Sequence, residues 1–216
     1  MIQILGGQQT ILDQFISELR DVEIQKDSMR FRKNLQRAGQ IFAYEISRKL
    51  NYRKLEVTTS LGMADSNVIA DNLVIASILR AGLPMHHGML DFFDHAENAF
   101  ISAYRKYGKS NGFKIAVEYA SSPDLEDKVL ILCDPMLATG ASMLMCFKEL
   151  INSGKPKHTH FVSLLASVEG VEYMKQHLQP DSYTLWLGAV DDELTAQAYI
   201  VPGLGDAGDL AFGKKL

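Results

Sequence analysis

The stretch VLILCDPMLATGAS, residues 129–142, joins a strongly apolar run to a polar loop. Residues 129–133 are all apolar, which is typical of a strand buried on both faces of a parallel sheet. Asp134 and Pro135 end this run, and small or hydroxylated residues follow at 138–142. Such a loop before a helix offers backbone N–H groups and hydroxyls to an anion. The stretch therefore predicts an anion-binding loop at one edge of a parallel sheet.

Similar apolar runs recur along the chain and predict the remaining strands. They cover residues 72–79, 98–104, 160–166 and 183–190. Helical spacing of apolar residues predicts helices over 31–50, over 142–152 with Gly154 after it, and over 168–178 with Pro180 after it. Strands that alternate with helices are typical of an α/β fold, here an open, mainly parallel sheet flanked by helices.

We expect one domain over residues 1–216, with three appended features. A helical arm is expected at about 10–50 and a C-terminal segment that forms a hood at about 191–216. Asn111-Gly112 lies between two strand-like arms and predicts a projecting hairpin at about 105–120. This hairpin could act as a lid over a ligand.

Composition excludes several classes of protein. The chain has 216 residues, 47% of them hydrophobic, and a net charge of −4, which argues against a general binder of nucleic acid or of membrane surfaces. Cys133 and Cys146, the two cysteines, lie in apolar patterns and predict buried thiols rather than a disulfide or a metal site. With no signal peptide and no apolar run of membrane-spanning length, we expect a soluble cytoplasmic protein.

Charged residues follow several of the predicted strands. Arg80, Arg105 and Asp134 each end an apolar run. Because ligands bind beyond the carboxyl ends of strands in an open parallel sheet, we expect these side chains and the 138–142 loop to meet there. Arginines and the loop suit phosphate oxygens, whereas a carboxylate suits sugar hydroxyls or a metal bound to phosphate. The combination predicts a site for a phosphorylated sugar.

The segment GLGDAG, residues 203–208, matches the dinucleotide-binding fingerprint in its letters. That fingerprint requires a strand before it, a helix after it and an acid about twenty residues on, and we expect no room for these before Leu216. Its glycines can instead bring bare backbone close to the polar edge of a flat base.

Several motifs together resemble the uracil phosphoribosyltransferases, a family of type I phosphoribosyltransferases. DPMLATGAS at 134–142 resembles the family's loop for 5-phosphoribosyl 1-pyrophosphate (PRPP), and the Asp-Pro pair is specific to it. The other matching motifs are RFRKNLQRAGQIFAYE at 30–45, ILRAG at 78–82, AYRKY at 103–107 and YIVPGLGDAGD at 199–209. The resemblance covers nearly the whole chain in the expected order.

The resemblance implies transfer of phosphoribose from PRPP to uracil, with UMP and pyrophosphate as products. It implies catalytic roles for Arg105, Asp134 and Asp206. The implied PRPP-binding residues are Arg80, Arg105, Asp134, Pro135, Met136, Leu137, Ala138, Thr139, Gly140, Ala141, Ser142 and Asp206. The implied uracil-binding residues are Ile200, Gly205, Asp206 and Ala207.

The resemblance also implies Mg²⁺ as cofactor, held mainly through PRPP and water rather than directly by the protein. It implies a homodimer or homotetramer, and leaves open whether GTP activates it. Ala141, Pro84, His86-His87 and Leu210 depart from the family's usual residues, which bears on affinity and regulation more than on reaction type.

Two other functions stay open. One is a regulator of the same fold that binds RNA, against which the acidic balance argues; the other is an enzyme of this fold with another base. We expect His86 and His87 to be helix or interface residues rather than metal ligands. We expect Asp191–Glu193 to cap a helix start rather than bind a cation, and Met136, Met143 and Met145 to pack in the core.

Overall fold

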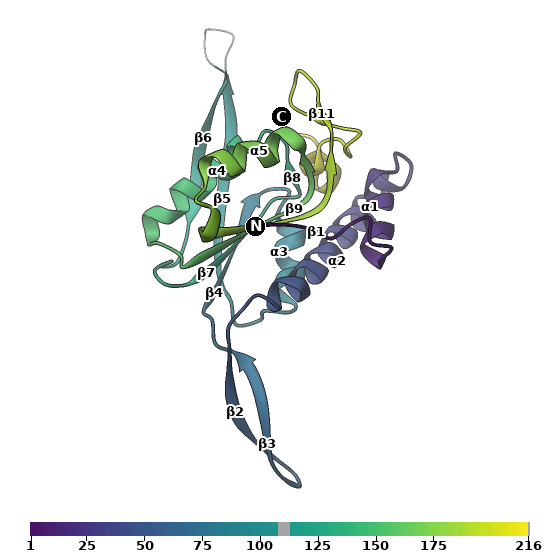
Figure 1. Ribbon diagram of the computed structural model, residues 1–216. Helices are drawn as coiled ribbons and strands as arrows, with labels where there is room; N and C mark the ends of the chain where they lie inside the picture. Colours follow the sequence, from purple (N-terminus) through teal and green to yellow (C-terminus); the bar gives the residue numbers. More distant parts are fainter. Residues whose placement is uncertain (108–112, 216) are drawn as a thin grey trace.

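The computed structural model describes residues 1–107 and 113–215, with backbone alone for 103–107 and 113–117. At its centre is an eight-stranded sheet in the order β1-β10-β9-β7-β4-β5-β6, with β8 beside β9 (Figure 1). All pairings are parallel except that of β5 with β6. The strands are β1 (Ile2–Ile4), β4 (Leu73–Leu79), β5 (Glu97–Tyr107), β6 (Phe113–Ser121), β7 (Val129–Cys133), β8 (Met136–Leu137), β9 (His158–Ser167) and β10 (Tyr183–Asp191). The predicted open, mainly parallel sheet is confirmed.

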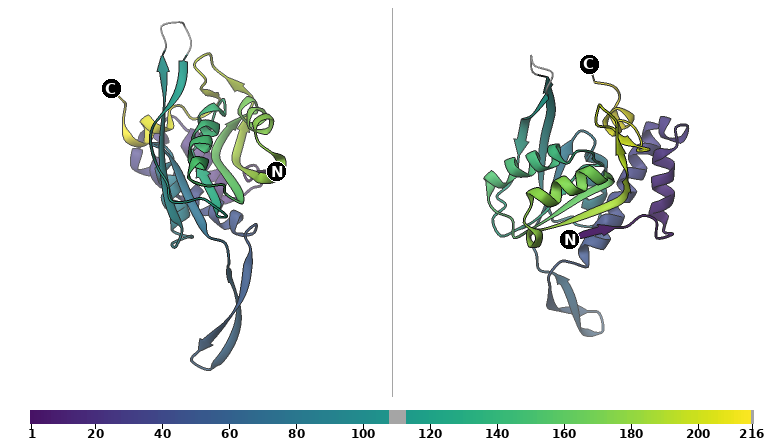
Figure 2. Two further views of the ribbon diagram at one scale, coloured as in Figure 1. Left: turned by 90° about the vertical axis from the view of Figure 1, so that its left-hand side faces the viewer. Right: turned by 45° about the horizontal axis from the view of Figure 1, so that its top comes forward.

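Helices cover both faces of this sheet, as Figures 1 and 2 show. On one face lie α1 (Ile11–Arg20), α2 (Ser28–Ser47), α3 (Leu83–Leu90) and α6 (Ala207–Phe212), and on the other α4 (Ala141–Leu150) and α5 (Val168–His177). Short 3₁₀ turns occur at η1 (Ile24–Lys26), η2 (Ile151–Ser153) and η3 (Pro180–Ser182). In the described residues, no helix is long and apolar enough to cross a bilayer.

The apolar runs form strands because neighbouring residues face two different cores. In β4, Ile75 packs with the α1–α2–α3 side and Val74 and Ala76 pack with the α4–α5 side. Successive side chains of a strand point to opposite faces, so a strand between two helical layers is apolar throughout. All five residues of β7 are buried for this reason. The five predicted strands are confirmed, as are the helices near 31–50, 142–152 and 168–178.

Two hairpins extend from the molecule at opposite ends (Figure 1). The expected one is β5–β6, whose strands pair antiparallel from Phe100 opposite Ser121 to Tyr107 opposite Phe113. Its Asn111-Gly112 turn lies outside the described residues. The second hairpin, β2 (Tyr52–Thr59) with β3 (Gly62–Ile69), was not predicted from the sequence.

The C-terminal segment forms a small layer of its own over the end of the sheet. It contains β11 (Glu193–Leu194), β12 (Ile200–Val201) and α6. The expectation that no strand and helix flank GLGDAG was wrong at the local level, since β12 precedes it and α6 begins within it. Asp206 allows this short helix by accepting a hydrogen bond from the Asp209 N–H at 2.9 Å.

Candidate active site

One cavity collects the polar residues that follow the strands. Its volume is about 660 Å³, and it lies beyond the carboxyl ends of β4 and β7, where Arg80 and Asp134 follow directly. It is lined by residues 78–81, 134, 136–140, 142, 143, 197–200, 205–208 and 215. Most of the residues predicted to bind a ligand therefore lie around one space.

The loop before α4 is built to present backbone N–H groups. Gly140 adopts the left-handed conformation, with φ of 77°, directly before the first residue of α4. Having no side chain, it leaves the first-turn N–H groups of α4 facing outward, where the helix dipole favours an anion. Thr139 and Ser142 add two hydroxyls to the cavity lining, and Thr139 Oγ1 lies 3.4 Å from the Ala141 N–H. The arrangement suits a phosphate group.

The loop is held in place by the start of α5. Ser167 Oγ donates a hydrogen bond of 2.6 Å to the Ala138 carbonyl and also accepts from the Gly170 N–H. A Cβ at Gly170 would collide with that same carbonyl, so glycine is needed for the loop to pack against α5. The second face of the sheet thus fixes the position of the cavity's anion-binding part.

Asp134 is the acid at the centre of the cavity. The pKa of its carboxyl is raised to about 7, mainly by burial and also by the nearby Asp206, while the Met136 N–H and Lys215 oppose the shift. Its Oδ1 lies 3.4 Å from the Met136 N–H. Because the carboxylate is held at a free-energy cost, a ligand that donates hydrogen bonds to it would relieve that cost. Sugar hydroxyls supply such donors.

Arg80 joins the sheet edge to the C-terminal segment. Its Nη2 donates to the Gly213 carbonyl at 3.0 Å and lies 3.3 Å from Asp209 Oδ1. Its Nε is buried and has no hydrogen-bond partner within the described residues. The guanidinium thus combines two contacts to the segment with an unused donor near the cavity.

The residues expected to meet a base come from two points of the C-terminal segment, Ile200 and residues 205–207, and all of them line the cavity. Ile200 is buried at the start of β12, whereas Gly205 and Asp206 are exposed to the cavity. Gly205 has φ of 93°, a conformation in which a side chain would be strained. The segment therefore offers backbone groups on a turn that only glycine adopts readily.

Among the predicted residues with described side chains, two do not line the cavity. These are Pro135 and Ala141, although their neighbours on both sides line it. Arg105 lies within β5, where its backbone pairs with Ile115, and its side chain lies outside the described part of the chain. Its predicted role in catalysis and pyrophosphate binding stays a prediction.

The sequence analysis also missed part of the lining. Gln197, Ala198 and Tyr199 enter from the loop before β12, and Lys215 enters from the tail. Tyr199 directly precedes the predicted Ile200, and Lys215 belongs to a pair of lysines in the tail, so both had a weak signal in the sequence. Met143 lines the cavity although it is only 2% exposed to solvent, so this residue belongs both to the core and to the site.

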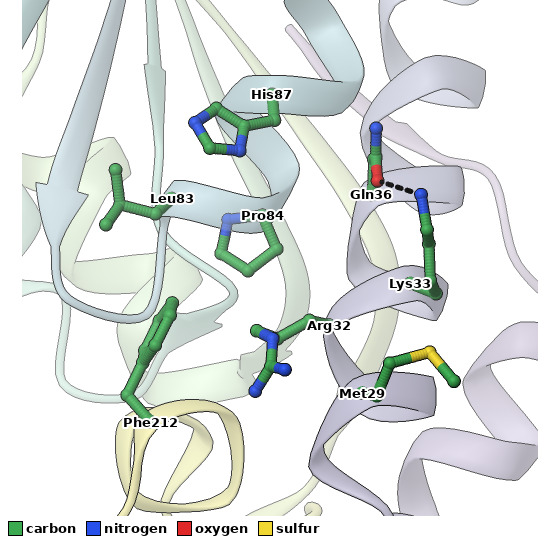
Figure 3. A pocket seen from close by; sticks show the side chains of 8 residues that line it. All are labelled: Met29, Arg32, Lys33, Gln36, Leu83, Pro84, His87 and Phe212. Atoms are coloured by element: carbon green, nitrogen blue, oxygen red, sulfur yellow. Dashed lines mark hydrogen bonds between the residues drawn. The ribbon is translucent and has the colours of Figure 1, made fainter.

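A second hollow, of about 340 Å³, is built from helices alone (Figure 3). Figure 3 shows Met29, Arg32, Lys33 and Gln36 on α2, Leu83, Pro84 and His87 on α3, and Phe212 on α6, with Lys33 hydrogen-bonded to Gln36. It contains no part of the 134–142 loop. The cavity at the sheet edge is therefore the candidate active site.

Comparison with known proteins agrees with this geometry. The family model described as uracil phosphoribosyltransferase matches residues 7–214, nearly the whole chain. This chain belongs to the uracil phosphoribosyltransferase family. A uracil phosphoribosyltransferase of Porphyromonas gingivalis is 52% identical over 212 residues, 98% of each chain. One of Pyrococcus furiosus is 37% identical over 205 residues, covering 93% of this chain and 85% of the relative.

Solved structures share the fold of this uracil phosphoribosyltransferase family member. The AQ2163 protein of Aquifex aeolicus superposes with a TM-score of 0.87 at 27% identity, covering 99% of this chain and 98% of the other. A hypoxanthine phosphoribosyltransferase of Staphylococcus aureus gives a TM-score of 0.50 at 14% identity, which concerns the fold alone.

The departures from the usual residues of the uracil phosphoribosyltransferase family fit their local structure. Ala141 is the first residue of α4 and has no left-handed conformation to strain it. Pro84 lies in the first turn of α3, where a missing N–H is tolerated. Leu210 is partly buried against the core. These three substitutions are therefore compatible with the backbone around them.

The structure also places the residues to which the sequence analysis gave no role in the site. Both cysteines are free and buried, as expected. His86 is buried in α3 and His87 lines the second hollow, and no metal-ligand cluster occurs among the described residues. The expectation that Asp191–Glu193 cap a helix was wrong, because Asp191 ends β10 and its carboxylate is bound by Arg20 and the Gly203 N–H.

Proposed function

We propose that this chain transfers the phosphoribosyl group of PRPP to uracil, releasing pyrophosphate and forming UMP for pyrimidine salvage. Near-full-length relatives of this name support the reaction. The observation that carries the proposal is the single cavity at the sheet edge. It unites an anion-binding loop, a carboxylate and a glycine-rich turn able to meet a base. The second hollow, between α2, α3 and α6, contains none of these three parts.

Each part of PRPP has a proposed partner in the cavity. The loop from Asp134 to Ser142 holds the 5′-phosphate at its backbone, with Thr139 and Ser142 adding hydroxyl donors. Asp134 accepts hydrogen bonds from the ribose hydroxyls, and Asp206 lies close to the sugar. Arg80 and Arg105 hold the pyrophosphate, whose charge matches their guanidinium groups.

The reaction is proposed to be stabilised by charge rather than by a covalent nucleophile. The C1–O bond breaks with its electron pair staying on the pyrophosphate oxygen, C1 bonds to N1 of uracil, and the N1 proton is released to solvent. Positive charge builds on the ribose while negative charge builds on the departing pyrophosphate. Arg80 and Arg105 oppose the second charge, and the acids near the sugar oppose the first. A hairpin around residues 105–120 acts as a lid that keeps water from the cationic sugar.

Mg²⁺ is the proposed cofactor, and it supplies positive charge to the pyrophosphate when bound. Asp134 and Asp206 line the cavity and carry the hard oxygen atoms that Mg²⁺ prefers. Two carboxylates suit an ion that keeps several waters and is held mainly through the substrate's phosphates. The residues present therefore fit this cofactor.

A panel of bases tests the proposal. Pyrophosphate release would be measured with PRPP and Mg²⁺ in the presence of uracil, cytosine, hypoxanthine, guanine or orotate. We expect pyrophosphate release with uracil and with none of the other four bases. Chelation of Mg²⁺ should abolish this release. Preference for another base would replace uracil by that base in the same reaction. Absence of turnover together with strongly salt-dependent RNA binding would favour the regulator instead.

Assembly and location extend the proposal. We expect a homodimer or homotetramer in the cytoplasm, without nucleic-acid or membrane partners. Whether GTP activates the enzyme is tested by adding GTP to the same assay at low PRPP concentration.

A further inference from the structure

An ion pair between two segments that are distant in the sequence binds the backbone of Gly203. Arg20, the last residue of α1, donates two hydrogen bonds of 2.7 Å to the carboxylate of Asp191, the last residue of β10. Arg20 Nη1 also donates to the Gly203 carbonyl at 2.9 Å, and the Gly203 N–H donates to Asp191 Oδ2 at 3.0 Å. Both backbone polar groups of Gly203 are thus bound by one ion pair, in which Asp191 is buried and Arg20 is partly buried.

Gly203 is a constrained position in the turn over the cavity. Its φ is 57°, and a Cβ there would collide with the Ile200 carbonyl. The turn runs from Ile200 to Gly205, and both of these residues line the cavity. A shift of Gly203 would therefore move the two cavity-lining positions on either side of it.

The pair is strong enough to set this turn before a ligand arrives. Asp191 is 7% exposed, and its fork-to-fork contact with Arg20 is the geometry of the strongest protein ion pairs. Burial opposes ionisation of Asp191, but the hydrogen bonds from Arg20 and Gly203 prevail and lower its pKa. Removal of Arg20 would leave the buried Asp191 carboxylate without its ion-pair partner.

We propose that Arg20 and Asp191 are positioning residues for uracil, which they serve by fixing the backbone of the 200–205 turn. The inference rests on the proposed function, because it assigns this turn to the base. Neither side chain lines the cavity, so the effect passes through Gly203. Arg20, on α1, thereby couples the N-terminal helical layer to base recognition.

This role is tested by measuring the KM for uracil and the KM for PRPP separately. Arg20→Lys keeps the charge but loses the fork that reaches Asp191 and Gly203 together. We expect the KM for uracil to rise about tenfold, a loss of about 1.4 kcal/mol, while the KM for PRPP changes less than about threefold. Asp191→Asn should act in the same direction.

The chain offers a matched control in the same helical layer. Arg30 makes a similar forked pair with Glu18, through contacts of 2.9 Å and 2.8 Å, which does not touch the C-terminal segment. Arg30→Lys should lower thermal stability comparably and leave the KM for uracil unchanged. Equal changes in both KM values in Arg20→Lys, or equal effects in the two lysine variants, would overturn the positioning role.

Hydrogen exchange in the substrate-free protein gives a second readout. Amides of residues 200–206 should exchange faster in Arg20→Lys and Asp191→Asn than in Arg30→Lys. Unchanged exchange there would overturn the inference while leaving the proposed function intact. Wild-type protein that fails to use uracil would instead remove the proposed function, and with it the assignment of this turn to uracil.

Discussion

Asp134 must serve both the folded chain and the proposed substrate. Burial raises the pKa of its carboxyl from an ordinary value of 3.8 to about 7. Between these pH values the folded chain keeps a proton that the unfolded chain releases. Its contribution to stability is therefore present at low pH and falls as pH rises through this window. At neutral pH the ionised acid weakens the empty protein, and hydroxyls of a bound sugar would offset that effect.

The first prediction follows from the direction of this pH dependence of stability. Asp134→Asn should raise the Tm of the substrate-free protein at pH 8 by at least about 2 °C, and by much less at pH 4. Calorimetry of both proteins across this range checks the expectation. Taking the difference between variant and wild type cancels the opposite trend of His160, whose burial lowers its pKa to about 3. A larger gain at pH 4 than at pH 8 would contradict the raised pKa.

Thr139 provides a prediction for the phosphate loop. Thr139→Val keeps the shape of the side chain but removes the hydroxyl that lines the cavity. Loss of a hydrogen bond to a charged group amounts to about 1.5–3 kcal/mol, so PRPP should bind at least about tenfold more weakly. Titration calorimetry measures this, with Thr58→Val on the β2–β3 hairpin as control. Equal PRPP affinity in wild type and Thr139→Val would remove this hydroxyl from the phosphate site.

Base selectivity tests whether backbone atoms read the base. If the N–H and C=O groups around Gly205 and Ile200 bind O4 and N3–H of uracil, cytosine presents the reverse order of donor and acceptor. Backbone groups cannot exchange roles as a flipped side-chain amide can. Two mismatched groups, at about 1–3 kcal/mol each, predict rejection by roughly a thousandfold in kcat/KM. The 5-fluoro analogue of uracil keeps both edges and should react. Cytosine turnover within tenfold of that of uracil would refute backbone reading.

At the scale of elements, α2 and α3 approach so closely that glycine is needed on both. A Cβ at Gly39 of α2 would collide with the Met85 carbonyl, and one at Gly88 of α3 would collide with the Gln36 carbonyl. α3 begins at Leu83, separated from the cavity-lining Arg80 and Ala81 by Gly82 alone, so its position is linked to the cavity edge. The close contact holds that edge against the N-terminal helices.

Gly88→Ala therefore tests this helix contact, because a tight contact and an ordinary helix interior predict opposite changes in the free energy of unfolding. In an ordinary helix interior the change stabilises a protein by about 0.5–1 kcal/mol. Here we expect a loss of more than about 1 kcal/mol, because the added methyl must push α2 and α3 apart. Chemical denaturation gives the free energy of unfolding. A stabilised variant would show that the two helices can separate freely.

The elements that could be predicted from sequence are those with a strong one-dimensional pattern. β4, β7, β9 and β10 are buried on both faces, so their apolar runs stand out. β2 and β3 escaped prediction because they show neither a continuous apolar run nor a regular alternation of polar and apolar residues, and most of their residues lie outside the core. β1 has only three residues, and its strand character comes from pairing with residues of β10 that lie 183 positions away, as in Ile2 opposite Leu185.

The site divides in the same way. Arg80, Asp134 and the 138–142 loop each follow a recognisable strand, and the rule for parallel sheets was enough to bring them together. The Arg20–Asp191 pair spans 171 positions, and no local pattern joins its members. From the sequence we expected Asp191 to cap a helix, because no local pattern indicates that Arg20 binds its carboxylate.

At the scale of the whole molecule, the β2–β3 hairpin is the feature that a single chain leaves unexplained. Figure 2 shows it standing away from the sheet, and all residues of β2 are exposed. Its register places Leu55, Val57, Ala64 and Val68 on one face, together with Arg53 and Ser66. The other face carries Lys54, Glu56, Asp65 and Asn67, together with Tyr52 and Met63. A two-stranded hairpin alone is marginally stable in water, so this apolar face calls for a covering surface.

A second copy of the chain is the occupant that fits the expected homo-oligomer. Every copy carries the same apolar stripe, so two copies related by a twofold axis can cover it with identical surfaces. Leu55→Ser with Val57→Ser should then shift the protein toward monomers in sedimentation velocity at micromolar concentration. Lys54→Ser with Glu56→Ser is the matched control, since it alters the neighbouring residues on the polar face. We expect the control to keep the wild-type assembly. A wild-type monomer, or equal behaviour of both double variants, would show that the hairpin does not join copies of this chain.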